Sequence, residues 1–319
     1  MLAKSIVTSK EIFDRAEKEL RFIVDHAVEP LFFTDKLYPQ RLKNCHDSPI
    51  LLYYKGKAAL NAQKIVSVVG TRTPSAHGKQ ITEKLIEDLR NSGILVISGL
   101  AYGIDITAHK AAFENGLDTV GVLAHGLDRV YPSAHTQFAG RMVEQGGLLT
   151  EHISETPPDR ENFPKRNRIV AGICDALIVI ESKRGGGSLI TATIANAYNK
   201  DVFAFPGKAG DVLSEGCNGL IKTNKANLIE SAADLFYIMN WDEELKPVKK
   251  SRQIPLPLNL SSEEQKIVDT FTNNKNQLHI DEICYATNFP ISKTSSCLLQ
   301  LEFSNIITSL PGKVYSLKS

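Results

Sequence analysis

Apolar segments that end on a glycine or another small residue constrain the fold of this chain most strongly. Three of them occupy residues 65–70, 94–99 and 119–124. Each is apolar at most positions, which is typical of a strand buried on both faces of a sheet. Stretches compatible with helices lie between them, among them residues 79–91 and 105–115. Strands and helices that alternate in this way predict right-handed crossovers and a parallel sheet covered by helices.

A length of 319 residues fits two or more domains. Further strand-like runs follow at residues 147–151, 176–180 and 202–205. We therefore place an α/β, Rossmann-like domain at residues 60–240. The helical pattern of residues 10–27 makes residues 1–59 an N-terminal helical segment. Residues 241–260 are rich in proline and charge without an amphipathic period, and we interpret them as a linker.

The last segment, residues 261–319, predicts a winged-helix domain. Ser261 and Glu264 have the spacing of a helix capping box. The three helical patterns that follow cover residues 265–272, 281–287 and 292–304. Two strand-like runs around Pro311 and Gly312 then predict a terminal hairpin. Three helices followed by a hairpin are typical of a winged helix.

The overall charge gives no sign of a polyanionic partner. Lys and Arg number 37 and Asp and Glu 36, so any anion site must come from local clustering. The five cysteines include no Cys-x-x-Cys pair, which disfavours a zinc site or a disulfide framework. No run approaches the ~20 apolar residues of a membrane span, and the N-terminus lacks a signal-peptide core. We expect a cytoplasmic protein with no membrane partner.

The loops that follow the first two predicted strands are candidate anion sites, because ligands bind at the carboxyl ends of parallel strands. The first loop has Gly70, Thr71 and Arg72, and the second begins at Ser98 and Gly99. The glycine spacing of a dinucleotide fingerprint and the Gly-Lys spacing of a P-loop are both missing, which disfavours NAD and ATP. An ordinary strand-to-helix turn remains the alternative for these residues.

A basic, aromatic segment is the most informative of the remaining motifs. Phe163, Lys165, Arg166, Asn167 and Arg168 combine cations, an aromatic ring and an amide that can bond a base edge. This combination suits single-stranded nucleic acid. A solvated, basic start of a helix is the alternative.

Gly187, Ser188 and Thr191 belong to a glycine-rich stretch between a strand and a helix, where backbone N–H groups can approach an anion. A flexible turn is again the alternative. Asp105 and His109 lie one helical turn apart, a spacing compatible with acid–base chemistry or metal binding. No third ligand matches them, so capping and loop bracing are the favoured roles. We predict no catalytic residue, no metal site and no cofactor.

The predicted winged helix is poorly suited to strong duplex binding. Residues 261–319 contain five basic and six acidic side chains and no arginine. Duplex affinity depends largely on neutralising phosphates. A duplex-binding regulator that acts through this domain is therefore disfavoured, and we expect the domain to contact a protein or to serve as an accessory.

Taken in order, the motifs resemble those of the bacterial DNA-processing protein A family, DprA or Smf. They run from YPQRLKNCHDSPILLYYKG through VVGTR, SGLAYGID, GLDRVYP, FPKRNRIVAG and GGGSLITA to VFAFPGK. The resemblance implies that the Rossmann-like domain binds single-stranded DNA and forms a homodimer. It also implies that the protein protects incoming DNA and loads a RecA-type recombinase in natural transformation and recombination.

Our hypothesis is that the glycines, hydroxyls and cations named above converge on one pocket that grips successive phosphates, while Phe163 stacks a base. No catalytic step is needed for this function. The alternative is a nucleotide-processing enzyme of the phosphoribohydrolase type, in which Glu181 or Asp105 would supply acid–base chemistry.

Overall fold

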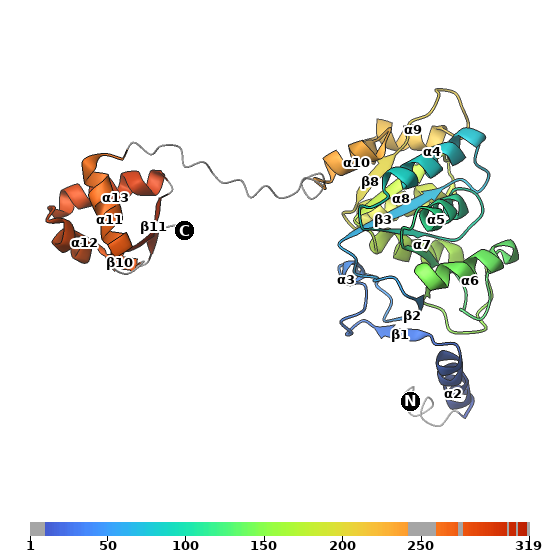
Figure 1. Ribbon diagram of the computed structural model, residues 1–319. Coiled ribbons are helices and arrows are strands. Elements are labelled where there is room, and N and C mark those ends of the chain that lie inside the picture. Colours follow the sequence, from blue (N-terminus) through green and yellow to red (C-terminus); the bar gives the residue numbers. More distant parts are fainter. Residues whose placement is uncertain (1–9, 242–259, 274–276, 305, 311, 318–319) are drawn as a thin grey trace. The chain divides into compact units, whose positions relative to one another are not determined.

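The computed structural model describes residues 10–241, 260–273, 277–304, 306–310 and 312–317. The chain divides into two compact units, residues 1–246 and residues 247–319 (Figure 1). Nearly all of the predicted linker, and Pro311 of the predicted hairpin, lie outside the described residues. Within the described ranges, no helix is both long and apolar enough to cross a membrane. All five cysteines are free thiols.

The first unit is built on a nine-stranded sheet in the order β1-β2-β6-β5-β4-β3-β7-β8-β9. Its strands are β1 (Glu29–Phe32), β2 (Leu51–Gly56), β3 (Lys64–Gly70), β4 (Ile94–Ser98), β5 (Thr119–Val122), β6 (Gly147–Thr150), β7 (Ala176–Ile180), β8 (Asp201–Ala204) and β9 (Asn227–Leu228). All neighbours from β6 to β9 in this order pair in parallel. The Rossmann-like prediction for the sheet is thus confirmed.

Helices cover both faces of this sheet (Figure 1). The side chains of β3 alternate between the two faces: Ile65 and Val69 belong to one buried cluster, and Val66 and Val68 belong to the other. The helices of the first cluster include α7 (Asn162–Gly172), α8 (Gly187–Ala197) and α9 (Glu215–Lys222). Those of the second are α4 (Ala76–Asp88), α5 (Ile104–Glu114) and α10 (Ala232–Ile238). A smaller cluster lies under α6 (Thr136–Gln145), which follows the short 3-10 helix Ser133–His135.

The predicted boundary at residue 60 is wrong, because residues 1–59 are not a separate helical segment. They contain α2 (Lys10–Asp25) and α3 (Gln40–Lys43), but also β1 and β2, which extend the sheet. β2 pairs antiparallel with β6, and β1 pairs antiparallel with β2. The Tyr54 hydroxyl fixes this edge by donating to the Ala58 carbonyl at 2.8 Å. Burial of these strands against the sheet joins the segment to the first unit.

The second unit has the predicted winged-helix content. Its elements are α11 (Ser262–Asn273), β10 (Gln277–His279), α12 (Ile280–Thr287), α13 (Ile291–Phe303), β11 (Ile307–Leu310) and β12 (Val314–Leu317). The capping box is confirmed, since the Ser261 amide donates to the Glu264 carboxylate at 2.8 Å and the Glu264 amide donates to the Ser261 hydroxyl at 3.2 Å. The short strand β10 was not predicted; it joins the hairpin in a three-stranded sheet.

Candidate nucleic-acid interface

The strand order places a cavity at the carboxyl ends of β3 and β7. From β3 the chain builds the sheet outward through β4, whereas β7 starts on the other side of β3 and continues to β8. The loops after β3 and β7 therefore diverge, which leaves a crevice at this switch point. A cavity of about 420 Å³ occupies it, and we call this cavity the crevice. Its lining includes Gly70, Thr71, Arg72, Phe163, Arg166, Asn167, Lys183, Gly187, Ser188 and Thr191.

The loop after β3 is fixed by its backbone. The Thr71 amide donates to the Glu181 carbonyl at 2.8 Å, and the Ile104 amide donates to the Thr71 carbonyl at 3.1 Å. Gly70 has no room for a side chain, because a Cβ atom there would lie 2.0 Å from the Ile180 carbonyl oxygen. At Gly103, where φ is +83°, a Cβ atom would lie 2.2 Å from the Thr71 carbonyl oxygen. Close backbone contacts on both sides thus present the next residue, Arg72, to the crevice.

Arg72 meets an aromatic wall. Its guanidinium lies 5.5 Å from the centre of the Phe163 ring, and Tyr131 lies 5.8 Å from the same ring, centre to centre. Within the part of the chain that the structure describes, Arg72 forms no ion pair with a carboxylate. A cation held only by an aromatic face keeps its N–H donors available for an anion.

Helix α7 brings only part of the predicted basic segment into the crevice. Phe163, Arg166 and Asn167 line it, as their helical spacing allows. Lys165 is exposed outside the lining, and Arg168 is held elsewhere by an ion pair with Glu151. The prediction that all of these residues face one pocket is wrong in this respect, because a helix turns Lys165 and Arg168 away from the face that carries the others.

Arg166 forms the floor of the crevice rather than an open anion site. Its side chain is 4% exposed and donates to the carbonyl oxygens of Gly99, at 2.6 Å, and Val122. Burial lowers the pKa of Arg166 to about 10, and the charge of Asp105 opposes this shift. Its Nε atom has no hydrogen-bond partner among the described residues. Gly99 has to lack a side chain, since a Cβ atom would lie 2.4 Å from the guanidinium.

Ser98, another predicted site residue, also lies beneath the crevice. Its hydroxyl is fully buried and donates to the Val68 carbonyl at 2.6 Å, which links β4 to β3. Neither Ser98 nor Gly99 lines the cavity. The prediction that they contact a ligand is not supported by this geometry, because the Arg166 side chain lies over Gly99.

Both carboxylates of the enzymatic alternative brace loops. Asp105 accepts from the amides of Gly99, at 3.2 Å, and Ala101, at 3.4 Å. Burial raises the pKa of Asp105, while Arg166 and these amides lower it. Glu181 accepts from the Ser75 amide at 2.8 Å and from the Ser75 hydroxyl. The bracing role predicted for Asp105 is confirmed.

The glycine-rich loop after β7 closes the other side of the crevice. Helix α8 begins there at Gly187, and no atom lies within 4 Å of the position of a Cβ atom on that residue. The Ser188 hydroxyl donates to the Ser182 hydroxyl at 2.9 Å, which holds the first turn of the helix. The positive end of the helix dipole and its free amides therefore border the cavity. Lys183 also lines the crevice and was not predicted. Its position in a Lys-Arg pair directly before three glycines was the available signal.

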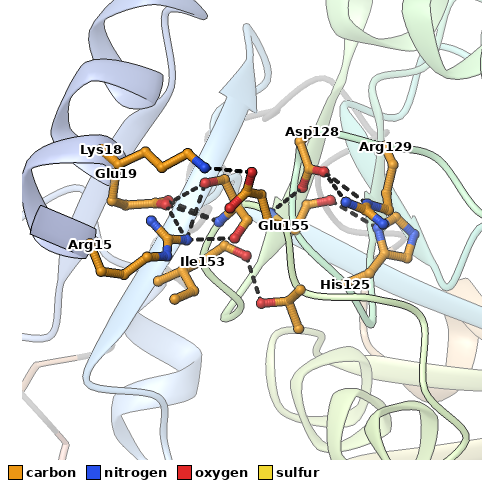
Figure 2. A network of polar contacts seen from close by, with 11 residues as sticks. Arg15, Lys18, Glu19, His125, Asp128, Arg129, Ile153 and Glu155 are labelled. Atoms are coloured by element: carbon orange, nitrogen blue, oxygen red, sulfur yellow. Dashed lines mark hydrogen bonds and ion pairs between the residues drawn. The ribbon is translucent and has the colours of Figure 1, made fainter. Parts of the chain in front are cut away.

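A network of polar contacts joins the N-terminal helix α2 to the loop of Asp128 (Figure 2). Arg15 on α2 donates to the Ser154 carbonyl at 2.6 Å, and the Ser154 amide donates to Glu19 at 3.0 Å. The next amide, that of Glu155, donates to Asp128 at 2.7 Å. Hydrogen bonds therefore connect α2 with Asp128, whose loop continues along the chain to Tyr131.

These features define a two-unit protein: a Rossmann-type sheet with a crevice of cations, helix amides and aromatic rings at its switch point, and a separate winged-helix unit. Residues 29–240 match the family described as DNA recombination-mediator protein A. Residues 252–313 match the DprA winged helix domain. The chain belongs to this family, which confirms the resemblance inferred from the motifs.

Named relatives agree with this assignment. The DNA processing protein DprA of Streptococcus pneumoniae is 42% identical over 201 residues, which cover 63% of this chain and 71% of the relative. That of Bacillus subtilis is 36% identical over 228 residues, covering 71% and 76%. The solved structure of DNA processing protein A from Helicobacter pylori has a TM-score of 0.61 at 27% identity and covers 67% of this chain and 96% of its own. That Helicobacter pylori protein binds single-stranded DNA.

Proposed function

We propose that this protein binds single-stranded DNA in the crevice without chemically changing it. Phosphates would lie against Arg72, Lys183 and the amides at the start of α8, and a base would stack on Phe163. The observation that carries this proposal is the position of Arg72, which has an aromatic partner and no ion pair among the described residues. The single-strand binding named for the Helicobacter pylori relative supports it.

We also propose that the bound strand is protected and then handed to a RecA-type recombinase. The family description, a recombination mediator, supports a role of this kind. A homodimer formed through the Rossmann-like unit would place two crevices on one strand and lengthen the track, with a gain in affinity from the higher effective concentration of the second site. Sedimentation of the protein with and without oligonucleotide tests this oligomeric state.

The enzymatic alternative is less well supported by the same geometry. A general acid or base needs a carboxyl group that exchanges a proton with the substrate. Asp105 lines the crevice, but its carboxylate accepts hydrogen bonds from the Gly99 and Ala101 amides, and Glu181 lies outside the lining. Incubation with nucleoside monophosphates tests this alternative. We expect no release of free base, and release of base would favour the phosphoribohydrolase reaction.

A salt titration of DNA binding tests the main proposal. We expect tighter binding of a single-stranded oligonucleotide than of its duplex. For Arg72→Ala, affinity should fall by about 10- to 150-fold, the value of one or two hydrogen bonds to a charged group. The dependence on salt should also weaken by about 0.7 logarithmic units per lost phosphate contact.

Arg90→Ala is the matched control for this test. Arg90 is exposed and follows the last residue of α4, at the opposite end of that helix from the crevice. Arg90→Ala removes the same positive charge as Arg72→Ala. Affinity for single-stranded DNA should stay within about twofold, because only the screened, long-range attraction between Arg90 and the phosphates is lost. Equal effects of the two substitutions would contradict the assignment of the crevice.

A further inference from the structure

A second cavity adjoins the crevice at Arg72. It has a volume of about 660 Å³ and lies between α4 and α5. Arg72 is the residue that lines both cavities, and the packing of Gly103 against the Thr71 carbonyl joins the two loops at this point. A chain that leaves the crevice past the Arg72 guanidinium therefore enters this second cavity, which we call the α4–α5 groove.

An aromatic ring stands at the entrance of the α4–α5 groove. Tyr102 lines the groove and is 49% exposed. Its ring meets the His135 ring edge-on, with centres 5.0 Å apart and planes at 71°. His135 is buried, and its Nδ1 atom bonds the Leu100 carbonyl at 2.9 Å. The Tyr102 ring is thus supported on one side and open on the other, which is the arrangement of a stacking platform for a base.

The charges of the groove are ordered along it. Besides Arg72, its lining contains Lys79 on α4 and Lys110 on α5, and neither lysine forms an ion pair within the described residues. Glu83 and Glu114 follow these lysines by one helical turn and also line the next cavity along the two helices. A polyanion is therefore attracted to the part of the groove at Lys79 and Lys110 and repelled one helical turn further along α4 and α5, at Glu83 and Glu114.

We propose that the α4–α5 groove is a further subsite for single-stranded DNA. It takes the nucleotide that continues from the crevice past Arg72, with its base on Tyr102 and its phosphate between Lys79 and Lys110. This inference rests on the proposed binding of a single strand in the crevice. It adds the direction in which the strand leaves the crevice. It also limits the groove to about one or two nucleotides, because Glu83 and Glu114 repel phosphates beyond the lysines.

Binding of thymidine oligonucleotides of two lengths to the full chain tests this subsite. An oligonucleotide of about 4 nucleotides fills the crevice, and one of about 12 also reaches the groove. For Tyr102→Ala, affinity for the longer one should fall by roughly 5- to 150-fold, and affinity for the shorter one should stay unchanged. Tyr102→Phe keeps the ring and should bind both as the unaltered protein does.

The two lysines are tested together. Lys79→Gln with Lys110→Gln should weaken the salt dependence for the longer oligonucleotide by about 0.7 logarithmic units, the value for the one phosphate placed between the two lysines. Lys84→Gln is the control, because Lys84 lies on α4 outside the groove and is already paired with Asp88 at 2.9 Å.

The outcomes separate the two proposals. If the unaltered protein binds neither oligonucleotide, the proposed function fails at the crevice, and the subsite fails with it. If it binds both and the Tyr102 and double-lysine variants behave as the unaltered protein, the subsite alone is overturned. An equal loss for both lengths also overturns it, because the groove would then not be separate from the crevice.

Discussion

The crevice and the winged-helix unit differ in what their cations contact. At the crevice, Arg72 faces an aromatic ring and has no ion pair within the described residues. In the winged helix, Lys293 is the one basic residue of α13, and it forms an ion pair with Glu263. Lys266 and Lys293 also lie over the Phe289 ring, at 5.2 and 5.3 Å from its centre. Among the described residues, the two units thus differ in the pairing of one cation each: Lys293 is paired with a carboxylate, whereas Arg72 is not.

The exposed surface of the winged helix points to a different use. Tyr285 on α12 is 91% exposed, and Phe303 and Leu299 on α13 are 83% and 54% exposed. Large apolar side chains left in water are more typical of surfaces that contact proteins than of surfaces that contact phosphates. The comparison teaches that local charge pairing, more than the type of fold, separates the candidate DNA-binding unit from the accessory unit.

The largest expected effect concerns Arg166, the buried cation beneath the crevice. Arg166→Ala should lower the free energy of unfolding by about 3–5 kcal/mol, because it leaves the buried Asp105 carboxyl without its compensating charge. Urea unfolding followed by tryptophan fluorescence measures this. Trp241 is the only tryptophan and packs against Phe236, so it reports on the first unit. Arg90→Ala should shift the curve little, and equal shifts would assign Arg166 to the surface.

A pH titration of stability should also set the two units apart. Burial lowers the pKa of His109 from 6.5 to about 3, and its Nδ1 atom lies 2.6 Å from the Thr119 hydroxyl oxygen. The folded state keeps this imidazole neutral, so its contribution is complete above about pH 6.5 and decreases as the pH falls toward 3. The loss is about 1.4 kcal/mol per pH unit.

Unfolding of the His109→Gln variant measures this contribution. Between about pH 6.5 and 4.5, the free energy of unfolding of this variant should change less steeply with pH than that of the unaltered protein. The difference in slope should be about 1.4 kcal/mol per pH unit, the value for one proton. Trp241 fluorescence again follows the first unit alone. A variant with the slope of the unaltered protein would show that other groups are responsible for the acid sensitivity.

The smallest effect is expected for the winged helix itself. Removal of residues 242–319 should change affinity for single-stranded DNA by less than about threefold, since the nine basic side chains of this segment are matched by nine acidic ones. Lys293→Gln should leave the affinity for single-stranded DNA unchanged, because the Lys293 ammonium is already paired with the Glu263 carboxylate. A salt-titrated binding curve compares both with the full chain. A loss as large as that of Arg72→Ala would reverse the contrast between the units.

The sequence predicted the order of the elements better than the limits of the site. Buried strands such as β3 and β7 are continuous apolar runs, so their places could be read directly. The edge strand β1 contains only four residues, one of them Pro30, and β10 only three, and neither shows a clear period. Strands of this kind are defined by their neighbours in the sheet rather than by local preference.

The crevice was predicted in part, because its loops follow the strands of a parallel sheet. Arg72, Phe163 and Asn167 lie where the strand order brings them together. The roles of Arg166 and Arg168 could not be predicted from composition, since the same residue type is a floor in one place and an ion-pair partner in the other. The role of each arginine depends on its tertiary partners, which are Gly99 for Arg166 and Glu151 for Arg168. Neither partner belongs to the segment that carries the two arginines.

The hydrogen bonds between α2 and the loop of Asp128 join the N-terminal helix to the segment that precedes Tyr131. Arg15 and Glu19 form hydrogen bonds with Ser154, and the Glu155 amide donates to Asp128 (Figure 2). A partner that pulled α2 away would loosen the ring beside Phe163 without touching the crevice. The affinity of the crevice for a strand would then depend on the position of α2, although α2 itself does not contact the strand.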